Sequence, residues 1–145
     1  HDLQAAALLA KLPFFDYWLE HRKKIAALYT RELAGIDGLV LPADIPGTER
    51  TWYRYVVQTQ RRDDLLNHLL GATPKDFFLQ PSLEYPVPVP SFEVFRGLGH
   101  KPGDFPCAER LAREVISLPL SQYVSVGYAG KIAKAVRTFY APEQR

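Results

Sequence analysis

The chain has 145 residues, 47% of them hydrophobic and 23% charged, which excludes intrinsic disorder and fits one globular domain. Its 18 basic and 16 acidic residues are interspersed and give a net charge of +2, so we expect no nucleic-acid partner. Because no apolar run reaches the roughly 20 residues of a membrane helix and the N-terminus lacks a cleavable signal pattern, we expect a cytoplasmic protein without a membrane partner.

Two helices are predicted in the first third of the chain. Residues 2–12 are rich in Ala and Leu, which favour a helix, and Pro13 either ends this helix or begins the next one. Apolar side chains then recur at three- and four-residue steps until Gly35 or Gly38 ends the pattern: Phe15, Trp18, Leu19, Ile25, Leu28, Tyr29 and Leu33. This spacing predicts a long amphipathic helix with one apolar stripe.

The start of the chain suggests that it was cut from a longer polypeptide. The first residue is His1 rather than Met, and the residues that follow already have the composition of the middle of a helix. We therefore expect a preceding segment in the parent protein.

A short α+β layer is predicted next. Residues 39–42 have the pattern of an extended piece followed by a turn, and residues 51–59, TWYRYVVQT, are dense in β-branched and aromatic side chains on both faces. The second segment therefore predicts a central strand. Residues 63–70 have the capping and spacing of a helix, with Gly71 at its end.

A long loop separates this layer from the last elements. Residues 72–100 carry a series of prolines that excludes a continuous helix: Pro74, Pro81, Pro86, Pro88 and Pro90. Loops of this length are more often functional than mere connections. Beyond the loop, the apolar spacing predicts a helix around 108–115, a short strand at 116–120 and a final amphipathic helix around 128–139.

The residues themselves predict no catalytic centre. Cys107 is the single cysteine, so no internal disulfide is possible, and its place in a predicted helix favours a buried, small apolar role. The following lysines fall on predicted solvent faces or a turn, where nothing argues for a lowered pKa: Lys11, Lys23, Lys24, Lys101, Lys131 and Lys134. No glycine-rich phosphate loop, paired-carboxylate signature or metal-ligand spacing is present, and His21, His68 and His100 are far apart in sequence.

Several blocks nevertheless resemble a known family when they are taken together and in order. They are LQAA at 3–6, the LAKL and HRKK helix that ends near Tyr29, YRYVVQ at 53–58, PGDFPCAERLAREVISLPL at 102–120 and KIAKAVRTFY at 131–140. This series is similar to the C-terminal part of the DegT/DnrJ/EryC1/StrS family, the pyridoxal-phosphate-dependent aminotransferases of nucleotide-linked keto sugars. The block at 102–120 is the most specific of them, whereas LQAA alone would be weak.

The resemblance implies an α+β fold. It would be the small C-terminal domain of a fold-type-I pyridoxal-phosphate aminotransferase, with a short, mostly antiparallel sheet packed with helices and preceded by a long amphipathic helix. Residues 1–145 would then form a single domain, in which 1–34 are connecting helices and 35–145 the α+β layer. The lysine that anchors pyridoxal 5'-phosphate would lie upstream of the LQAA block, in a missing N-terminal domain, so this chain would hold no catalytic residue and would be inactive alone.

The implied activity belongs to the full-length protein. It would transfer an amino group, usually from glutamate, to a nucleotide-linked keto-deoxy sugar for polysaccharide or antibiotic-sugar biosynthesis, and it would be a homodimer with active sites at the subunit interface. The nucleotide sugar and the amino donor would be its small-molecule partners. An alternative is a non-catalytic, diverged member that acts as an interaction or pleiotropic regulatory module.

The resemblance also places a substrate-binding loop in the proline-rich segment. Family members carry a loop of the type T-R-x-F-F-Y-P or H-Y-P-x-P-x-H, and this chain matches it in two registers, one with Lys75, Phe77 and Phe78 and the other with Glu84 and Tyr85. Lys75 would pair with a diphosphate, and the aromatic rings would stack on a base or a sugar. The alternative is that the aromatic rings cover the core and Lys75 is merely solvated.

Three departures from the family pattern leave the sugar specificity and the activity open. Glu84 stands where histidine is usual, Pro90 where a second histidine is frequent, and Ser121 with Gln122 where the family often has His-Pro.

Overall fold

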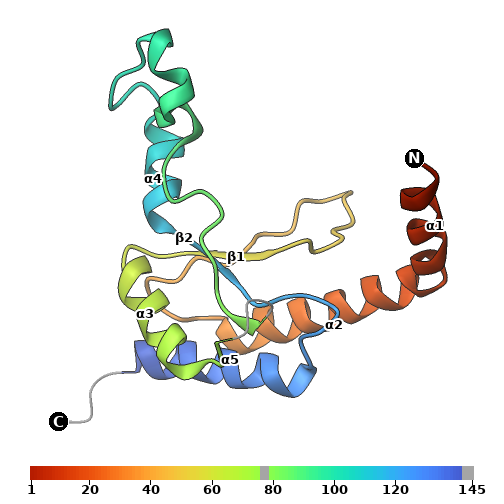
Figure 1. The fold of residues 1–145 in the computed structure, drawn as a ribbon. Helices are drawn as coiled ribbons and strands as arrows, with labels where there is room; N and C mark the ends of the chain where they lie inside the picture. Colours follow the sequence, from red (N-terminus) through yellow and green to blue (C-terminus); the bar gives the residue numbers. More distant parts are fainter. Residues whose placement is uncertain (76–78, 142–145) are drawn as a thin grey trace.

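Two parallel-running helices and a small antiparallel sheet form the centre of the molecule in the computed structural model, which describes residues 1–75 and 79–141 (Figure 1). The helical elements are α1 (Asp2–Lys11), η1 (Leu12–Phe14), α2 (Phe15–Leu33), α3 (Arg62–Ala72), η3 (Val89–Ser91), η4 (Glu93–Leu98), α4 (Pro106–Glu114) and α5 (Val126–Tyr140). The strands are β1 (Tyr55–Gln58) and β2 (Val115–Leu118). The predicted α+β class, with its long N-terminal helix and short antiparallel sheet, is confirmed.

The sheet is short but flanked on both sides. β1 pairs with β2 in the register Tyr55↔Leu118 to Gln58↔Val115. A single bridge joins Val40 to Gln58 on the outer side of β1, and another joins Ser82 to Ser117 on the outer side of β2. Segments far apart in the sequence are therefore held at both edges of the sheet.

The core lies between the sheet and helices α2, α3 and α5. α2 and α5 run side by side in the same direction, since His21 contacts Val124 near their N-termini and Arg137 contacts Glu32 near their C-termini (Figure 1). The largest fully buried side chains come from all five elements and from the segment before α5: Ile25, Tyr29, Leu33, Tyr55, Val57, Leu65, Leu69, Ile116, Leu118, Val124, Ile132 and Val136. Burial of this apolar surface is the main stabilising contribution to the fold.

Two parts of the molecule lie outside this core. Residues 86–105, together with the N-terminal half of α4, project from the sheet as an arm, and no residue of 86–105 is buried (Figure 1). At the other end of the molecule, α1 extends beyond α2 and also contains no buried residue.

No helix within 1–75 and 79–141 combines the length and the apolarity needed to cross a bilayer.

Three expectations from the sequence need correction. The strand predicted over 51–59 is confined to Tyr55–Gln58, because Trp52 has a φ of +53°, which interrupts an extended backbone. Gly71 lies inside α3, which continues to Ala72, rather than ending it. Cys107 is exposed, not buried, because it lies in the first turn of α4, which is part of the arm, and Ala112 is the buried residue of that helix.

Candidate functional site

Two arginines from different elements line a small polar pocket beside the sheet. Arg22 comes from α2 and Arg54 from the residue before β1, and the chain after β2 closes the pocket from the other side. The pocket has a volume of about 230 Å³, and its other lining residues are Tyr53, Gln80, Pro119, Leu120, Ser121, Gln122 and Tyr123. We call it the arginine pocket.

Arg22 connects α2 to the two other segments that line the arginine pocket, the residues before β1 and the chain after β2. Its Nη1 donates hydrogen bonds to the carbonyl oxygens of Trp52 and Tyr53, each at 3.2 Å, and its Nη2 donates to Oε1 of Gln122 at 3.3 Å. Burial, followed by the neighbouring charge of Arg54, lowers the pKa of Arg22, although a guanidinium remains charged at neutral pH. The Trp52 carbonyl belongs to the residue with positive φ, so Arg22 helps to hold an unusual backbone conformation.

Arg54 is incompletely satisfied within the described residues. Its Nη2 pairs with Oε2 of Glu84 at 3.3 Å, and its guanidinium lies 5.2 Å from the ring centroid of Tyr53. Its buried Nε has no hydrogen-bond partner in the part of the chain that the structure describes. The arginine pocket is thus lined by two guanidinium groups, of which Arg54 is paired with a carboxylate, and this leaves an excess of positive charge suited to an anionic ligand.

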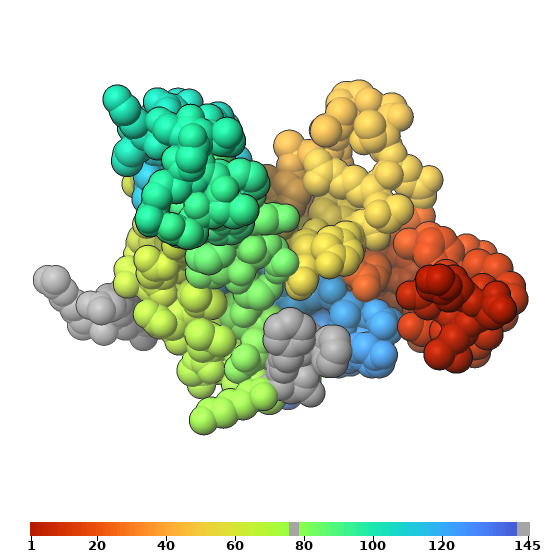
Figure 2. Space-filling model, turned by 45° about the horizontal axis from the view of Figure 1, so that its top comes forward, coloured from red at the N-terminus to blue at the C-terminus, as the bar shows by residue number. Residues whose placement is uncertain are grey.

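An apolar pocket adjoins the arginine pocket on the other side of Glu84. Its volume is about 450 Å³, and it is lined by Val56 of β1, by Glu84 and Tyr85, by the prolines of the arm and by one face of α4. The lining residues from α4 and the adjacent strand are Ala108, Leu111, Ala112, Val115 and Ser117. Figure 2 shows the surface hollowed between the arm and the segment around residues 44–53.

The structure brings together part of the sequence-predicted site. Glu84 and Tyr85 both line the apolar pocket, and the ion pair between Glu84 and Arg54 connects that pocket to the arginine pocket. Lys75 is exposed and belongs to the lining of neither pocket. Phe77 and Phe78 lie outside the described residues.

Arg22 and Arg54 were missed from the sequence, although each carries a recognisable signal. Arg54 is the single charged residue within the apolar run TWYRYVVQT, and Arg22 stands at the edge of the apolar stripe of α2, three residues before buried Ile25. A charge at such a boundary is half-buried, where an unpaired cation is costly unless it has a partner.

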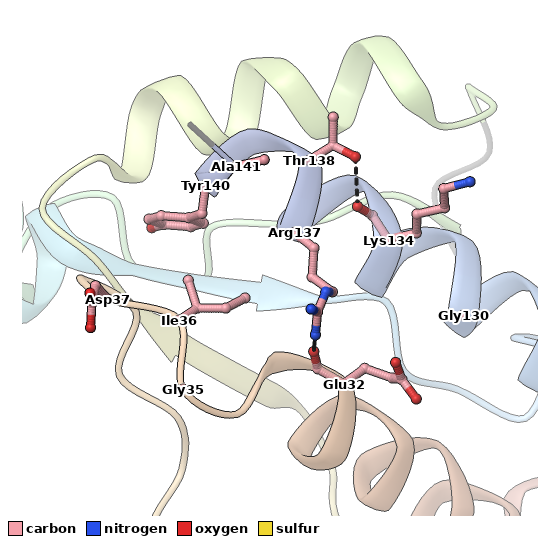
Figure 3. Close-up of a pocket in the computed structure, with 10 residues that line it drawn as sticks. All are labelled: Glu32, Gly35, Ile36, Asp37, Gly130, Lys134, Arg137, Thr138, Tyr140 and Ala141. Carbon is pink, nitrogen blue, oxygen red and sulfur yellow. Dashed lines mark hydrogen bonds between the residues drawn. The ribbon is translucent and has the colours of Figure 1, made fainter. Parts of the chain in front are cut away.

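A third hollow, of about 750 Å³, lies between the ends of α2 and α5 (Figure 3). Arg137 crosses it and donates to the carbonyl oxygen of Glu32 at 2.9 Å, while the side chain of Lys134 extends away from Arg137. Tyr140 of its lining donates to Oγ1 of Thr59 at 2.6 Å. The Arg137 contact holds the two helix ends together, the Tyr140 contact joins α5 to the residue after β1, and both give the hollow a structural role.

The described residues do not fit the anchor of pyridoxal phosphate. Schiff-base chemistry needs a desolvated lysine whose pKa is lowered, whereas these lysines are exposed: Lys11, Lys24, Lys75, Lys101, Lys131 and Lys134. Lys23 is bonded to Glu49 and to Glu20, and these hydrogen bonds raise its pKa, which is the opposite of what the chemistry requires. Within residues 1–75 and 79–141, no group of three His, Cys, Asp or Glu side chains is placed to hold a metal ion.

Comparison with known proteins places the whole of this architecture in one family. The model of the DegT/DnrJ/EryC1/StrS aminotransferase family matches residues 1–137. The erythromycin biosynthesis sensory transduction protein EryC1 of Saccharopolyspora erythraea is 38% identical over 124 residues, which are 86% of this chain and 32% of that protein. The dTDP-3-amino-3,4,6-trideoxy-alpha-D-glucose transaminase of Streptomyces venezuelae is 35% identical over 136 residues, which are 94% of this chain and 35% of that protein.

A solved structure agrees with these sequence matches. The crystal structure of S. venezuelae DesV in complex with a ketimine intermediate superposes with a TM-score of 0.87 at 34% identity, covering 96% of this chain and 36% of that one. The chain therefore spans about a third of the length of the curated relatives that it matches. From the matched residues and the shared fold, we conclude that the chain belongs to the DegT/DnrJ/EryC1/StrS aminotransferase family.

Proposed function

We propose that this chain is the substrate-covering C-terminal domain of a pyridoxal-phosphate-dependent aminotransferase. The full-length enzyme would transfer an amino group from glutamate to a nucleotide-linked keto-deoxy sugar and would act as a homodimer. Residues 1–34 would connect this domain to the rest of the enzyme, and residues 35–145 would form the layer that covers the substrate. Family membership and the similarity to the S. venezuelae transaminase support this proposal.

The arginine pocket is the observation that carries the proposal. A nucleotide sugar contains a diphosphate, whose oxygens accept charge-assisted hydrogen bonds from guanidinium groups. Arg22 and Arg54 offer two such groups in a half-buried place, and one donor of Arg54, its Nε, has no partner among the described residues. In the proposed complex, Arg54 binds the diphosphate and Arg22 positions the Trp52–Tyr53 backbone beside it.

The apolar pocket suits the less polar part of the same substrate. Deoxygenation removes hydroxyl groups from a sugar and leaves apolar faces, which Val56, Tyr85 and Leu111 would contact. Glu84, paired with Arg54, would lie between the two parts. Lys75, Phe77 and Phe78 remain predicted contacts from the neighbouring loop.

The cofactor would be held by the part of the enzyme that this chain does not contain. Pyridoxal phosphate, when bound, supplies the electron sink for amino transfer. The residues of this chain would bind and orient the substrate and exclude water above it.

A binding experiment tests the assignment of the arginine pocket. The 145-residue chain is titrated with thymidine diphosphate and followed by NMR of the arginine Nε–Hε signals. We expect Arg54→Ala to weaken binding about tenfold or more, as the loss of a charge-assisted contact does. The matched control is Arg96→Ala, which removes an exposed arginine of the arm that pairs with Glu93. Equal affinities of the two variants would rule out the arginine pocket as the diphosphate site.

The regulatory alternative is tested on the complete polypeptide that the gene encodes. It is favoured by the name of the relative described as a sensory transduction protein. An aminotransferase should bind pyridoxal phosphate with visible absorbance and aminate a nucleotide-linked keto sugar at the expense of glutamate. A colourless protein without this activity would instead support the interaction module.

A further inference from the structure

α1 carries leucines on three sides and yet has no buried residue. Three leucines of this ten-residue helix are largely exposed, with Leu3 at 84% and both Leu8 and Leu9 at 68%. At 3.6 residues per turn, these leucines point in three directions that are roughly 100–140° apart. The remaining apolar residues of the helix are Ala5, Ala6, Ala7 and Ala10, and its polar residues are Asp2 and Gln4 in the first turn and Lys11 at the other end.

The apolar surface continues into the turn that follows. Leu12, Phe14, Phe15 and Tyr17 are also exposed, and they connect α1 to the first turn of α2. We call Leu3, Leu8, Leu9, Leu12, Phe14, Phe15 and Tyr17 the N-terminal apolar surface. Exposed apolar surface of this extent is typical of an interface.

The directions in which the leucines of α1 point help to decide whether its partner is a second copy of this chain or an enclosing groove. In a symmetric contact with a second copy, two α1 helices packed against each other would cover about one face of each helix and leave the opposite leucine exposed. A helix with large apolar side chains on all three sides is typically enclosed within the core of a larger unit. A groove that surrounds α1 therefore fits better than a flat helix pair.

The comparisons indicate where such a groove comes from. The family model matches from residue 1 onward, so α1 belongs to the family pattern. The relatives are about three times as long as the matched segment, so two thirds of their length has no counterpart in this chain. That missing part is large enough to form a core of its own.

We infer that the N-terminal apolar surface docks into an apolar groove of the catalytic part of the aminotransferase, and that this docking orders α1. The inference rests on the proposed function for the identity of the partner. Docking would fix the angle between α1 and α2 at Pro13, and with it the position of the arginine pocket relative to the cofactor. An isolated ten-residue helix is marginally stable in water, so α1 would otherwise fray.

Hydrogen–deuterium exchange tests the inference on two samples, the 145-residue chain and the complete polypeptide that its gene encodes. We expect the amides of residues 5–11 to exchange at least 100-fold more slowly in the complete polypeptide than in the 145-residue chain. Equal, fast exchange in both samples would overturn the inference, as would a gene that encodes no catalytic part. Protection in the 145-residue chain that rises with concentration, together with a dimer mass, would overturn it in favour of a second copy.

A pair of variants provides a readout that is independent of activity. The double substitution Leu8→Asp and Leu9→Asp should leave the melting temperature of the 145-residue chain unchanged and lower that of the complete polypeptide. The matched control is Val94→Asp with Leu98→Asp, which places the same charges on two exposed side chains of the arm. An unchanged melting temperature of the complete polypeptide would contradict docking. Protection of α1 in a protein without aminotransferase activity would retain the docking and reject the proposed function.

Discussion

Glu84 determines how much of the charge of Arg54 is available to a ligand. The two side chains are both partly exposed and lie 3.3 Å apart, so their mutual attraction is modest, about 0–1 kcal/mol. The carboxylate therefore competes with an anionic ligand for the same guanidinium.

Removal of this competition should strengthen anion binding. We predict that Glu84→Gln increases the affinity of the 145-residue chain for thymidine diphosphate by up to about fivefold, because it removes a charge but keeps a similar shape. Glu93→Gln is the matched control, since Glu93 pairs with Arg96 on the arm. Weaker binding by Glu84→Gln would mean that Glu84 positions Arg54 rather than competing with the ligand.

Tyr29 makes the fold less stable at alkaline pH. Its hydroxyl is buried and donates to the carbonyl oxygen of Pro119 at 2.8 Å, and burial raises its pKa far above the ordinary value of 10.0. Because the folded-state pKa is raised, the stabilisation is complete below pH 10 and is lost as the pH rises above it. The unfolded chain releases this proton first, at a cost of about 1.4 kcal/mol of stability per pH unit.

Substitution of Tyr29 should flatten this pH dependence. We expect Tyr29→Phe to cost about 1 kcal/mol at neutral pH, because it removes a buried hydrogen bond, and to reduce the loss of stability above pH 10. Urea denaturation at pH 7 to 11 measures both effects. Tyr17→Phe, at an exposed tyrosine, is the control, and identical pH profiles for the two variants would contradict the assignment.

At the scale of single elements, the N-terminus of α5 depends on one side chain. The hydroxyl of Ser125 accepts a hydrogen bond from the backbone N–H of Tyr128 at 3.1 Å and caps the helix that carries Ile132 and Val136 into the core. We predict that Ser125→Ala lowers the free energy of unfolding by about 1 kcal/mol, as measured by urea denaturation. Ser91→Ala, on the arm, should change it by less than about 0.5 kcal/mol. A similar change in both variants would show that the cap is not a stabilising contact.

The elements that the sequence predicted well are those with strong periodicity. α2 and α5 were identified because their apolar side chains repeat at helical spacing and become buried in the same core. The strand over 51–59 was predicted too long because propensity cannot foresee the positive φ of Trp52, whose carbonyl is held by Arg22 from 30 residues away. The burial of Cys107 was predicted wrongly because local pattern does not show that α4 begins on a projecting arm.

At the scale of the whole molecule, the core and the arm should respond differently to proteolysis. No residue between 86 and 105 is buried, and Arg96 lies in this segment before Gly97, whereas the proline after Lys101 blocks tryptic cleavage there. We predict an early tryptic cut after Arg96 that leaves the circular dichroism and thermal unfolding of the nicked chain nearly unchanged. Mass spectrometry identifies the cut, and a large drop in melting temperature would show that the arm is part of the cooperative unit.

The candidate site could be predicted only in part, because it depends on topology. Family resemblance directed attention to Glu84 and Tyr85, and both line a pocket. The arginine pocket could not be predicted, because its lining comes from α2, the residues before β1 and the chain after β2. These segments meet only when the sheet and the helices pack together. Arg22 and Gln122 are 100 positions apart, and no local pattern connects them.

The single-residue bridges at the two edges of the sheet have a consequence for aggregation. Val40 and Ser82 each occupy the hydrogen-bonding groups of one outer position, so only a few unpaired backbone groups remain on either side of a four-residue ladder. Edge-to-edge growth into amyloid requires a long, flat row of such groups. High concentrations of this chain should therefore produce amorphous or reversible clusters through exposed leucines, and not fibrils that bind thioflavin T.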